Sequence, residues 1–227
     1  MDRAPLCGVS IGLTPRRRGV RAASVPYLLG YDLTPSHSPS VPSSPWTFAL
    51  VVGVAYLLGA ISPGHWLVRR KTGHDLRDHG SGATGATNAS RILGRSGFVV
   101  VLVLDAVKGA LAVLIARALG VSGGWEFAAA AAVIAGHVWP PHLAFRGGRG
   151  LGPLLGSWLL LAPLALSGAM IVAMIVWAAT GRRVLGGMVG AAVLPATTFW
   201  ETDALVATGF AAVTFAIVAM AHRVSRR

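Results

Sequence analysis

The sequence predicts an all-α, polytopic integral membrane protein with about seven transmembrane helices, its N-terminus outside the cell and its C-terminus in the cytoplasm. The chain of 227 residues is 54% hydrophobic and only 12% charged, whereas soluble domains are about 25% charged. Apolar stretches of about 20 residues, long enough to cross a bilayer, recur along it. The basic residues fall in alternate gaps between these stretches. This alternation is typical of multi-pass proteins whose lysines and arginines stay in the cytoplasm.

Apart from Lys108 and Arg117, the basic residues between the first and last apolar stretches alternate with gaps that contain none. The basic-free gaps carry Glu126 in one case and Glu201 with Asp203 in the other. Two glycine-rich motifs lie in basic gaps, so we expect them to act together on the cytoplasmic face. The basic positions are Arg69, Arg70, Lys71, Arg77, Arg91 and Arg95, then Arg146 and Arg149, then Arg182 and Arg183, and finally Arg223, Arg226 and Arg227.

The net charge of +12 does not indicate a nucleic-acid-binding protein. The positive charge is banded between apolar stretches instead of being gathered on one soluble domain. We therefore predict no nucleic-acid partner. The single cysteine, Cys7, excludes a disulfide framework and any multi-cysteine metal site.

Residues 1–45 are predicted to be a disordered tail rich in proline, serine and arginine, followed by a membrane domain over residues 46–227. The tail has no apolar stretch long enough to span a bilayer, and such a composition buries too little surface to fold. A cleaved signal peptide is disfavoured by Pro26, and a misassigned start codon explains the tail equally well. An outside N-terminus would export the basic residues of the tail, so either the tail is absent from the mature protein or the inside charges prevail.

The apolar stretches predict the membrane helices in order. The first has a break at Ser62-Pro63-Gly64, because proline removes a helix hydrogen bond. Residues 151–180 form one apolar block, which Pro163 divides in two. We prefer two helices here because a single span would invert the charge pattern. The predicted helices cover residues 46–67, 97–119, 125–145, 151–161, 164–180, 184–199 and 204–221.

Glycines at positions 80, 82 and 85 characterise the first basic loop, where a tight turn can present N–H groups to an anion. A short helix is predicted to begin near Thr87 and to end at Gly94. Arg91 shares a face with Thr87 and Asn88, and its guanidinium can bind phosphate oxygens as a fork. The alternative is a flexible, solvated loop.

The second basic loop runs from His137 to Gly150. Arg146 and Arg149 enclose Gly147 and Gly148, so both guanidiniums and the amides between them can face one anion. His137 is either a base or a structural hydrogen-bonding residue at a helix end.

Asp105 and Lys108 lie one turn apart inside the second apolar stretch. Charges at membrane depth are costly unless they pair, face the bundle or serve function. We favour a structural ion pair over a direct catalytic role.

These motifs together resemble the bacterial membrane glycerol-3-phosphate acyltransferases that take the acyl group from acyl phosphate. The resemblance covers about residues 56–223 and depends on several motifs in one order. They are Asp75-Leu76-Arg77, Gly80-Ser81-Gly82, Gly85-Ala86-Thr87-Asn88 with Arg91, Asp105 with Lys108-Gly109, Gly136-His137 with Pro140, and Phe145 with Gly147-Gly148 and Gly150.

The resemblance implies acyl transfer to the 1-hydroxyl of glycerol 3-phosphate, which gives lysophosphatidate and phosphate in the first step of phospholipid synthesis. It implies a site on the cytoplasmic face of the bacterial inner membrane, no metal or other cofactor, membrane lipid as surroundings, and a functional link to an enzyme that makes acyl phosphate. The implied catalytic residues are Ser81, Arg91, His137 and Arg149. The implied substrate- and phosphate-binding residues are Gly82, Thr87, Asn88, Arg146, Gly147, Gly148 and His222.

The chain departs from the family pattern at several positions. Ala83 replaces an asparagine, Arg146 and Arg149 replace lysines, and a third motif reads Val184-Leu185-Gly186-Gly187-Met188 without its serines. Arginine is not equivalent to lysine at a tight site, because it exchanges a point charge for a planar fork. A diverged, non-catalytic lipid- or phosphate-binding relative and a small transporter therefore remain the alternatives.

Overall fold

The computed structural model describes residues 44–224, and most of these residues are helical. The predicted tail lies outside the described residues, apart from Ser44 and Pro45. The helices are α1 (Pro45–Ala60), α2 (Pro63–Thr72), α3 (Ala86–Ala118), α4 (Glu126–Val138), α5 (Leu151–Leu161), α6 (Pro163–Thr180), α7 (Arg183–Thr202) and α8 (Leu205–Val224), with short 3-10 turns η1 (Leu76–Asp78) and η2 (Pro141–Leu143). The predicted all-helical fold is confirmed.

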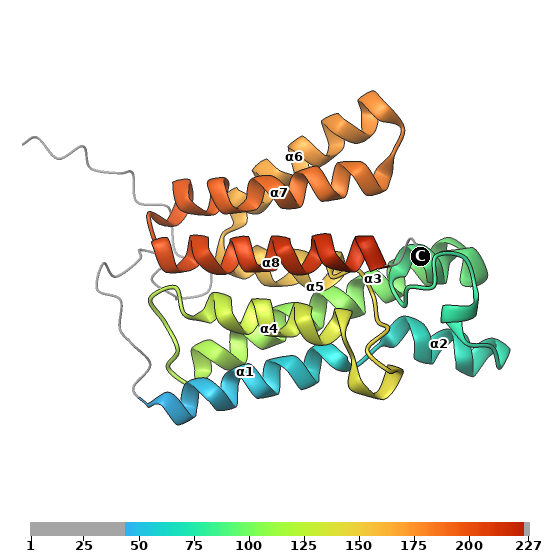
Figure 1. Ribbon diagram of the computed structural model, residues 1–227, viewed down its shortest axis with the longest axis horizontal. Coiled ribbons are helices and arrows are strands. Elements are labelled where there is room, and N and C mark those ends of the chain that lie inside the picture. Colours follow the sequence, from blue (N-terminus) through green and yellow to red (C-terminus); the bar gives the residue numbers. More distant parts are fainter. Residues whose placement is uncertain (1–43, 225–227) are drawn as a thin grey trace, which may run out of the picture. The chain divides into compact units, whose positions relative to one another are not determined.

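Within residues 44–224, five helical segments are long and apolar enough to cross a membrane: 45–72, 86–118, 163–180, 184–202 and 205–222. The helices α4 and α5, with 13 and 11 residues, are shorter than the span of about 20 residues that a bilayer requires. Both short helices are instead packed between longer ones. The helix α4 contacts α1, α3 and α8, and α5 contacts α3, α4 and α6 (Figure 1).

Several predicted breaks are confirmed. The first apolar stretch divides at Ile61-Ser62, immediately before Pro63. The first part of α3, from Ala86, is interrupted at Gly94, whose φ of 70° and ψ of −162° are not helical. The long apolar block divides at Ala162-Pro163.

The predicted end of the third helix is wrong. It was expected to reach Phe145, but α4 ends at Val138. Two prolines follow at 140 and 141, and Ala144 and Phe145 have φ of 52° and 60°. The residue before a proline avoids helical geometry, and positive φ turns the chain out of any helix. The apolar character of this segment therefore reflects a loop packed on the bundle.

Close helix packing depends on glycines. A Cβ at Gly59 would collide with the backbone of Val133, and one at Gly136 would collide with the backbone of Tyr56. These two positions let α1 and α4 approach each other, as small residues do between membrane helices. Nearly all side chains of α4 are buried, as expected for a helix that is apolar all round.

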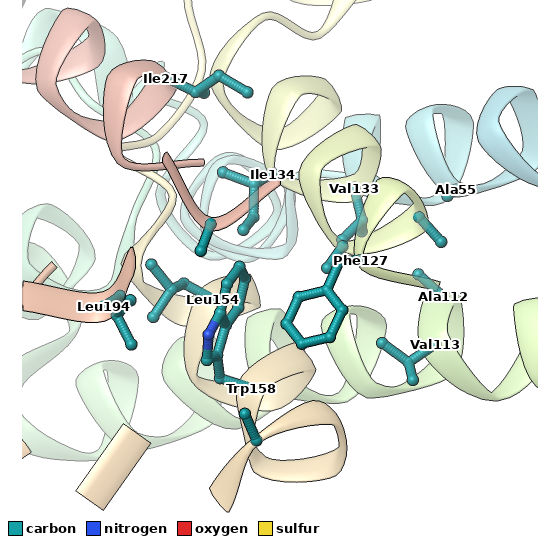
Figure 2. Close-up of a cluster of buried hydrophobic side chains, with 14 of the residues drawn as sticks. Ala55, Ala112, Val113, Phe127, Val133, Ile134, Leu154, Trp158, Leu194 and Ile217 are labelled. Atoms are coloured by element: carbon teal, nitrogen blue, oxygen red, sulfur yellow. The ribbon is translucent and has the colours of Figure 1, made fainter. Parts of the chain in front are cut away.

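The core lies around Trp158 of α5, which is fully buried (Figure 2). Its ring meets that of Phe127 edge to face, with centroids 5.6 Å apart, and its Nε1 donates to Thr198 Oγ1 at 3.2 Å. Leu154, Leu194 and other apolar residues complete the cluster. This packing joins α4, α5 and α7.

The gaps that the sequence identifies as basic lie together at one end of the helices (Figure 1). The α2–α3, α4–α5 and α6–α7 connections and the end of α8 lie at that end, whereas the α3–α4 and α7–α8 connections lie at the opposite end. The two glycine-rich motifs therefore share one end of the bundle.

Candidate functional site

Two loops form the candidate site: the first glycine loop, residues 73–85, and the second glycine loop, residues 139–150. Two hydrogen bonds join them directly. Thr84 N donates to Gly147 O at 3.2 Å, and Arg77 Nη1 donates to Leu143 O at 2.8 Å. Segments more than 60 residues apart in sequence are thus held against each other.

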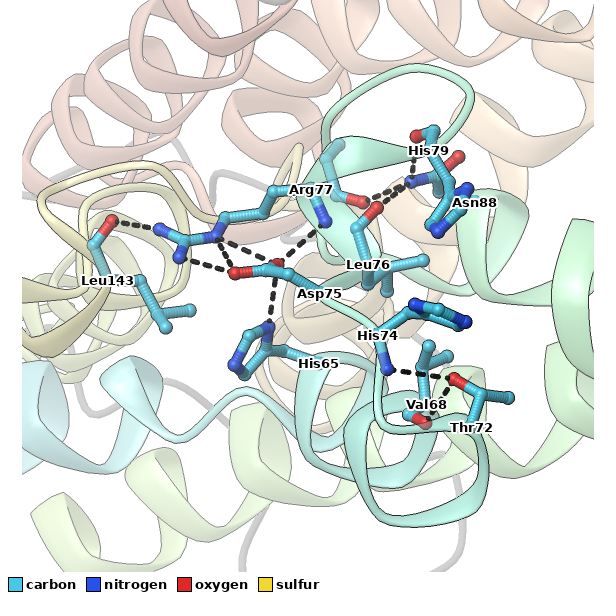
Figure 3. A network of polar contacts seen from close by, with 11 residues as sticks. His65, Val68, Thr72, His74, Asp75, Leu76, Arg77, His79, Asn88 and Leu143 are labelled. Carbon is cyan, nitrogen blue, oxygen red and sulfur yellow. Dashed lines mark hydrogen bonds and ion pairs between the residues drawn. The ribbon is translucent and has the colours of Figure 1, made fainter.

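An ion pair anchors the beginning of the first glycine loop (Figure 3). The Asp75 carboxylate accepts from Arg77 Nε at 3.1 Å and from Nη2 at 2.6 Å, and it also accepts from the Arg77 backbone N–H at 2.9 Å. His65 Nδ1 lies 3.2 Å from Asp75 Oδ1. The hydrogen bonds from Arg77 hold the pKa of Asp75 well below its usual value, and the same pairing raises the pKa of Arg77. Because Arg77 also bonds to Leu143, this pair connects α2 with both loops.

Asn88 organises the rest of the first glycine loop (Figure 3). It is buried, and its amide nitrogen lies 2.9–3.0 Å from the carbonyl oxygens of Leu76, His79 and Ala83. Its amide oxygen accepts from Ser81 N at 3.1 Å. A side-chain amide has two N–H donors and an oxygen with two lone pairs, so these contacts use both donors and one of the lone pairs. The amide of Asn88 thus holds the loop, and binding of substrate by Asn88 stays a prediction.

Arg91 lies over the first glycine loop. A Cβ at Gly80 would collide with Arg91 Nη1 and would lie within 2.9 Å of its Cδ. Gly80 and Gly82 also have φ of 59° and 68°, values that favour glycine. Thr87, in the first turn of α3, is exposed, and Ser81 is half-buried. The exposed guanidinium of Arg91 is thus brought to the same end of α3 as the hydroxyls of Ser81 and Thr87.

The second glycine loop folds back on the end of α4. Gly147 N donates to Val138 O at 3.0 Å, and Gly148 N donates to His137 O at 2.9 Å. A Cβ at Gly148 would collide with the His137 ring at Nε2. The imidazole edge therefore lies directly against this turn, and Gly148 is the residue that leaves room for it.

His137 also joins a buried charged cluster. Lys108 Nζ lies 2.8 Å from His137 Nδ1 and 2.9 Å from Asp105 Oδ1. It donates to Gly59 O at 2.9 Å and to Ile61 O at 2.7 Å. The predicted ion pair between Asp105 and Lys108 is confirmed. Its contact with His137 was not predicted, because the histidine lies on another helix and no sequence spacing connects the two.

The remaining predicted residues lie at the same end of the bundle but differ in exposure. Arg146 is exposed and Arg149 is half-buried. His222 is buried in α8, with Nδ1 2.8 Å from Val218 O. A Cβ at Gly150 would lie 3.2 Å from a Val218 methyl group. The last turns of α8 thus lie against the end of the second glycine loop.

The segment that corresponds to the third motif opens α7. Gly187 faces the start of α5, since a Cβ there would lie 3.2 Å from Leu151. Leu185 is exposed and Met188 is half-buried. None of these residues supplies a hydroxyl. Within residues 44–224, no three His, Cys, Asp or Glu side chains are grouped as a metal site.

Two apolar grooves open on the bundle. The first, of about 640 Å³, lies at the break between α1 and α2 and combines apolar with polar side chains. It is lined by Leu57, Ala60, Ile61, Ser62, His65, Trp66, Pro141 and His142. The second, of about 440 Å³, is lined by residues of α3, α5 and α6, including Ala106, Leu155, Leu159, Leu166 and Met170.

The long apolar helices, with polar loops at one of their ends, are those of an integral membrane protein. Comparison with known proteins identifies its family. The sequence profile of the glycerol-3-phosphate acyltransferases matches residues 49–227. The chain belongs to the glycerol-3-phosphate acyltransferase family, as the sequence motifs predicted.

Individual relatives support this assignment. A glycerol-3-phosphate acyltransferase of Syntrophotalea carbinolica is 42% identical over 167 residues, which cover 71% of this chain and 84% of that protein. Glycerol-3-phosphate acyltransferase 1 of Desulfitobacterium hafniense is 44% identical over 134 residues, which cover 59% of this chain and 66% of that protein. The crystal structure of PlsY, an integral membrane glycerol 3-phosphate acyltransferase, in its glycerol 3-phosphate form is similar with a TM-score of 0.72 and 29% identity, covering 78% of this chain and 88% of that one. Its lysophosphatidic acid form gives a TM-score of 0.69 at 27% identity.

Proposed function

We propose that this protein transfers an acyl group from acyl phosphate to the 1-hydroxyl of glycerol 3-phosphate, with release of inorganic phosphate and formation of lysophosphatidate. Family membership establishes the acyltransferase class. The observation that carries the proposed site is the direct bonding of the two glycine loops through Thr84 and Gly147. It holds the loop under Arg91 against the loop that carries Arg146 and Arg149, and two phosphorylated substrates require positive charge.

The arginines balance the charge of the substrates in this proposal. Arg91 comes from α3, and Arg146 and Arg149 come from the second glycine loop. Each guanidinium can bind two phosphate oxygens in parallel, and these charge-assisted hydrogen bonds are stronger than neutral ones. Holding both substrates in reactive geometry and stabilising the developing charge can each lower a barrier by several kcal/mol.

Other residues take supporting parts. Ser81 and Thr87 are the proposed donors to substrate oxygens, through their hydroxyl groups. The amides of Gly82, Gly147 and Gly148 already donate to the carbonyls of His79, Val138 and His137, so these glycines are proposed to shape the phosphate site by keeping the two loops free of side chains. Asn88 is proposed to shape the first glycine loop, because its amide bonds to backbone groups. His222 is proposed to complete the acceptor site from α8.

The groove at the α1–α2 break is the proposed site of the acyl chain. Leu57, Ala60 and Ile61 line its apolar part, and Ser62 and His65 give it a polar part. His65 contacts Asp75 of the first glycine loop. An acyl phosphate needs such a groove, apolar along its length and polar at the reacting end.

The membrane topology belongs to the same proposal. Seven membrane segments, two of them short and shielded by neighbours, would place the N-terminus outside and the C-terminus and site in the cytoplasm. The clustering of basic connections at one end of the helices supports this orientation. The protein would then work in the bacterial inner membrane, downstream of an enzyme that makes acyl phosphate.

The altered third motif favours one alternative, a phosphate- or lipid-binding relative without turnover. Leu185, Gly187 and Met188 provide no side-chain donor to an acceptor molecule. Such a protein would bind glycerol 3-phosphate without forming product.

The test combines complementation with an assay of purified protein. The gene should restore growth of a bacterium that lacks its own acyl-phosphate-dependent acyltransferase, and the protein should form lysophosphatidate and inorganic phosphate in equal amounts. Arg91→Ala should abolish turnover, whereas Arg95→Ala, an exposed arginine beyond the Gly94 break, should not. Binding of glycerol 3-phosphate without product would favour the non-catalytic alternative.

A further inference from the structure

The cluster of Asp105, Lys108 and His137 assigns a definite protonation pattern to the histidine. All three side chains are buried, with 2–4% of their surface exposed. Asp105 and Lys108 are one turn apart on α3, and His137 comes from the last turn of α4. A charged lysine at this depth is retained only where every proton has an acceptor.

The acceptors of Lys108 are fixed by the break between α1 and α2. The carbonyl of Gly59 would bond to the N–H of residue 63 in a continuous helix, but Pro63 has no N–H. Lys108 Nζ takes that place and also donates to Ile61 O. Its third short hydrogen bond, 2.8 Å long, goes to His137 Nδ1.

The third bond determines the tautomer of His137. An ammonium group has three donors and no acceptor, so the nitrogen that it contacts must accept. Nδ1 of a neutral imidazole accepts only when the ring proton is on Nε2. Asp105 Oδ1 is farther from Nδ1, at 3.4 Å. Its 2.9 Å contact with the ammonium is an ion pair without hydrogen-bond geometry, so the third proton of Lys108 is left for His137 Nδ1. The usual pair of a carboxylate and an Nδ1–H is therefore displaced by the lysine.

We propose that Lys108 is a positioning residue that keeps the proton of His137 on Nε2, where it faces the turn at Gly148, so that His137 acts in acyl transfer as a hydrogen-bond donor and not as a general base. The role of His137 in acyl transfer rests on the proposed function, whereas its tautomer does not. The Nε2–H would donate to a substrate oxygen that gains negative charge during the reaction. Backbone bonds of Gly147 and Gly148 to α4 hold the turn beside the ring.

His222 provides an internal comparison. Its Nδ1 lies 2.8 Å from Val218 O, and a carbonyl oxygen only accepts, so here Nδ1 carries the proton. His137 and His222 are thus expected to have opposite tautomers. The difference follows from their neighbours alone, a lysine in one case and a carbonyl in the other.

The first experiment reads the tautomer without any substrate. The full-length protein, labelled with ¹⁵N-histidine and held in lipid nanodiscs at neutral pH, is studied by NMR, which separates protonated from unprotonated ring nitrogens. The His137 signals are assigned by their loss in His137→Gln and those of His222 by their loss in His222→Gln. We expect an unprotonated Nδ1 and a protonated Nε2 in His137, and the reverse in His222. A protonated Nδ1 in His137 would overturn the proposal.

The second experiment separates a donor from a base. His137→Gln keeps N–H donors but has no basic nitrogen, whereas His137→Leu has neither. Loss of one donor to a developing charge costs about 100-fold in kcat or more, so we expect His137→Leu to fall by about that factor and His137→Gln to retain at least about tenfold more activity than His137→Leu. Equal loss in both variants would contradict the donor role.

The third experiment addresses Lys108 itself. In Lys108→Met the nearest partner of His137 Nδ1 is Asp105, so the proton should move to Nδ1 and the NMR pattern should invert. We expect kcat to fall by about tenfold or more while KM for glycerol 3-phosphate changes by less than about threefold. An unchanged tautomer in the folded variant would overturn the role of Lys108. If the variant does not fold, the measurement on the wild-type protein still decides the proposal.

The outcomes distinguish the proposed acyl-transfer function from the proposed tautomer of His137. Absence of acyl transfer by the wild-type protein would remove the proposed function, yet the tautomer of His137 would still be measured. Conversely, an active enzyme with a protonated Nδ1 on His137 would keep the function and refute the inference.

Discussion

Asn88 allows the sharpest test of how the first glycine loop is held. Asn88→Ala removes contacts to Leu76, His79 and Ala83 and the bond from Ser81 N. Two N–H donors and one acceptor amount to three full hydrogen bonds, each worth about 0.5–1.5 kcal/mol net, so the cost is on the order of 2–4 kcal/mol. If Asn88 is a scaffold, this cost is expressed as loss of loop structure and not as weaker substrate contact.

The assay follows loop order and catalysis in parallel. We expect faster limited proteolysis within residues 73–85, a lower unfolding temperature and a reduced kcat in Asn88→Ala. Asn88→Asp should behave similarly, because a carboxylate cannot donate to carbonyl oxygens. The matched control is Ser90→Ala, which loses a single bond to Thr87 O within the same helix. A variant at position 88 with unchanged protease resistance and unfolding temperature but a higher KM for glycerol 3-phosphate would refute the scaffold role and support direct binding.

Two further predictions concern the loop anchor and the acyl groove. The pKa of Asp75 is lowered chiefly by its hydrogen bonds with Arg77, so its stabilising effect is present above the ordinary value of about 4 and is lost only as the pH falls through the lowered value. The difference in unfolding temperature between wild type and Asp75→Asn should thus not decrease from neutral pH to about pH 5, since protonation of the neighbouring His65 can only add to the pairing; its disappearance already near pH 6 would contradict the pairing. In the groove, Leu57→Trp should raise KM for long-chain acyl phosphate with little effect on a short-chain donor, whereas Leu159→Trp in the second groove should not. The opposite result would indicate that the acyl chain binds in the second groove.

Much of the fold follows from local rules and could be predicted. The alternation of basic and acidic gaps agrees with the two ends of the bundle, and Pro63, Gly94 and Pro163 mark real breaks. These signals are local, because proline lacks an N–H and glycine adopts positive φ whatever surrounds it. The end of α4 was missed because apolar composition between residues 139 and 145 does not distinguish the end of a helix from a loop that follows it.

The candidate site was predicted less completely, for a physical reason. The glycine loops were identified by composition, and their proximity agrees with the charge pattern. The contacts of Asn88 with the loop backbone were not predicted, because the same amide can bind a ligand or backbone carbonyls. The bond between Lys108 and His137 depends on how α3 crosses α4, and no pattern within either helix contains that information.

The gap between α1 and α2 and the lysine buried beside it depend on each other. Pro63 leaves a carbonyl without its helical donor, and Lys108 brings a charge into a region with little water. Each would destabilise the bundle alone, but together the carbonyls replace water around the cation and the cation replaces the missing N–H. Replacing the proline to make the first helix continuous would thus not be neutral, since the new backbone N–H would compete with the buried ammonium for the Gly59 carbonyl.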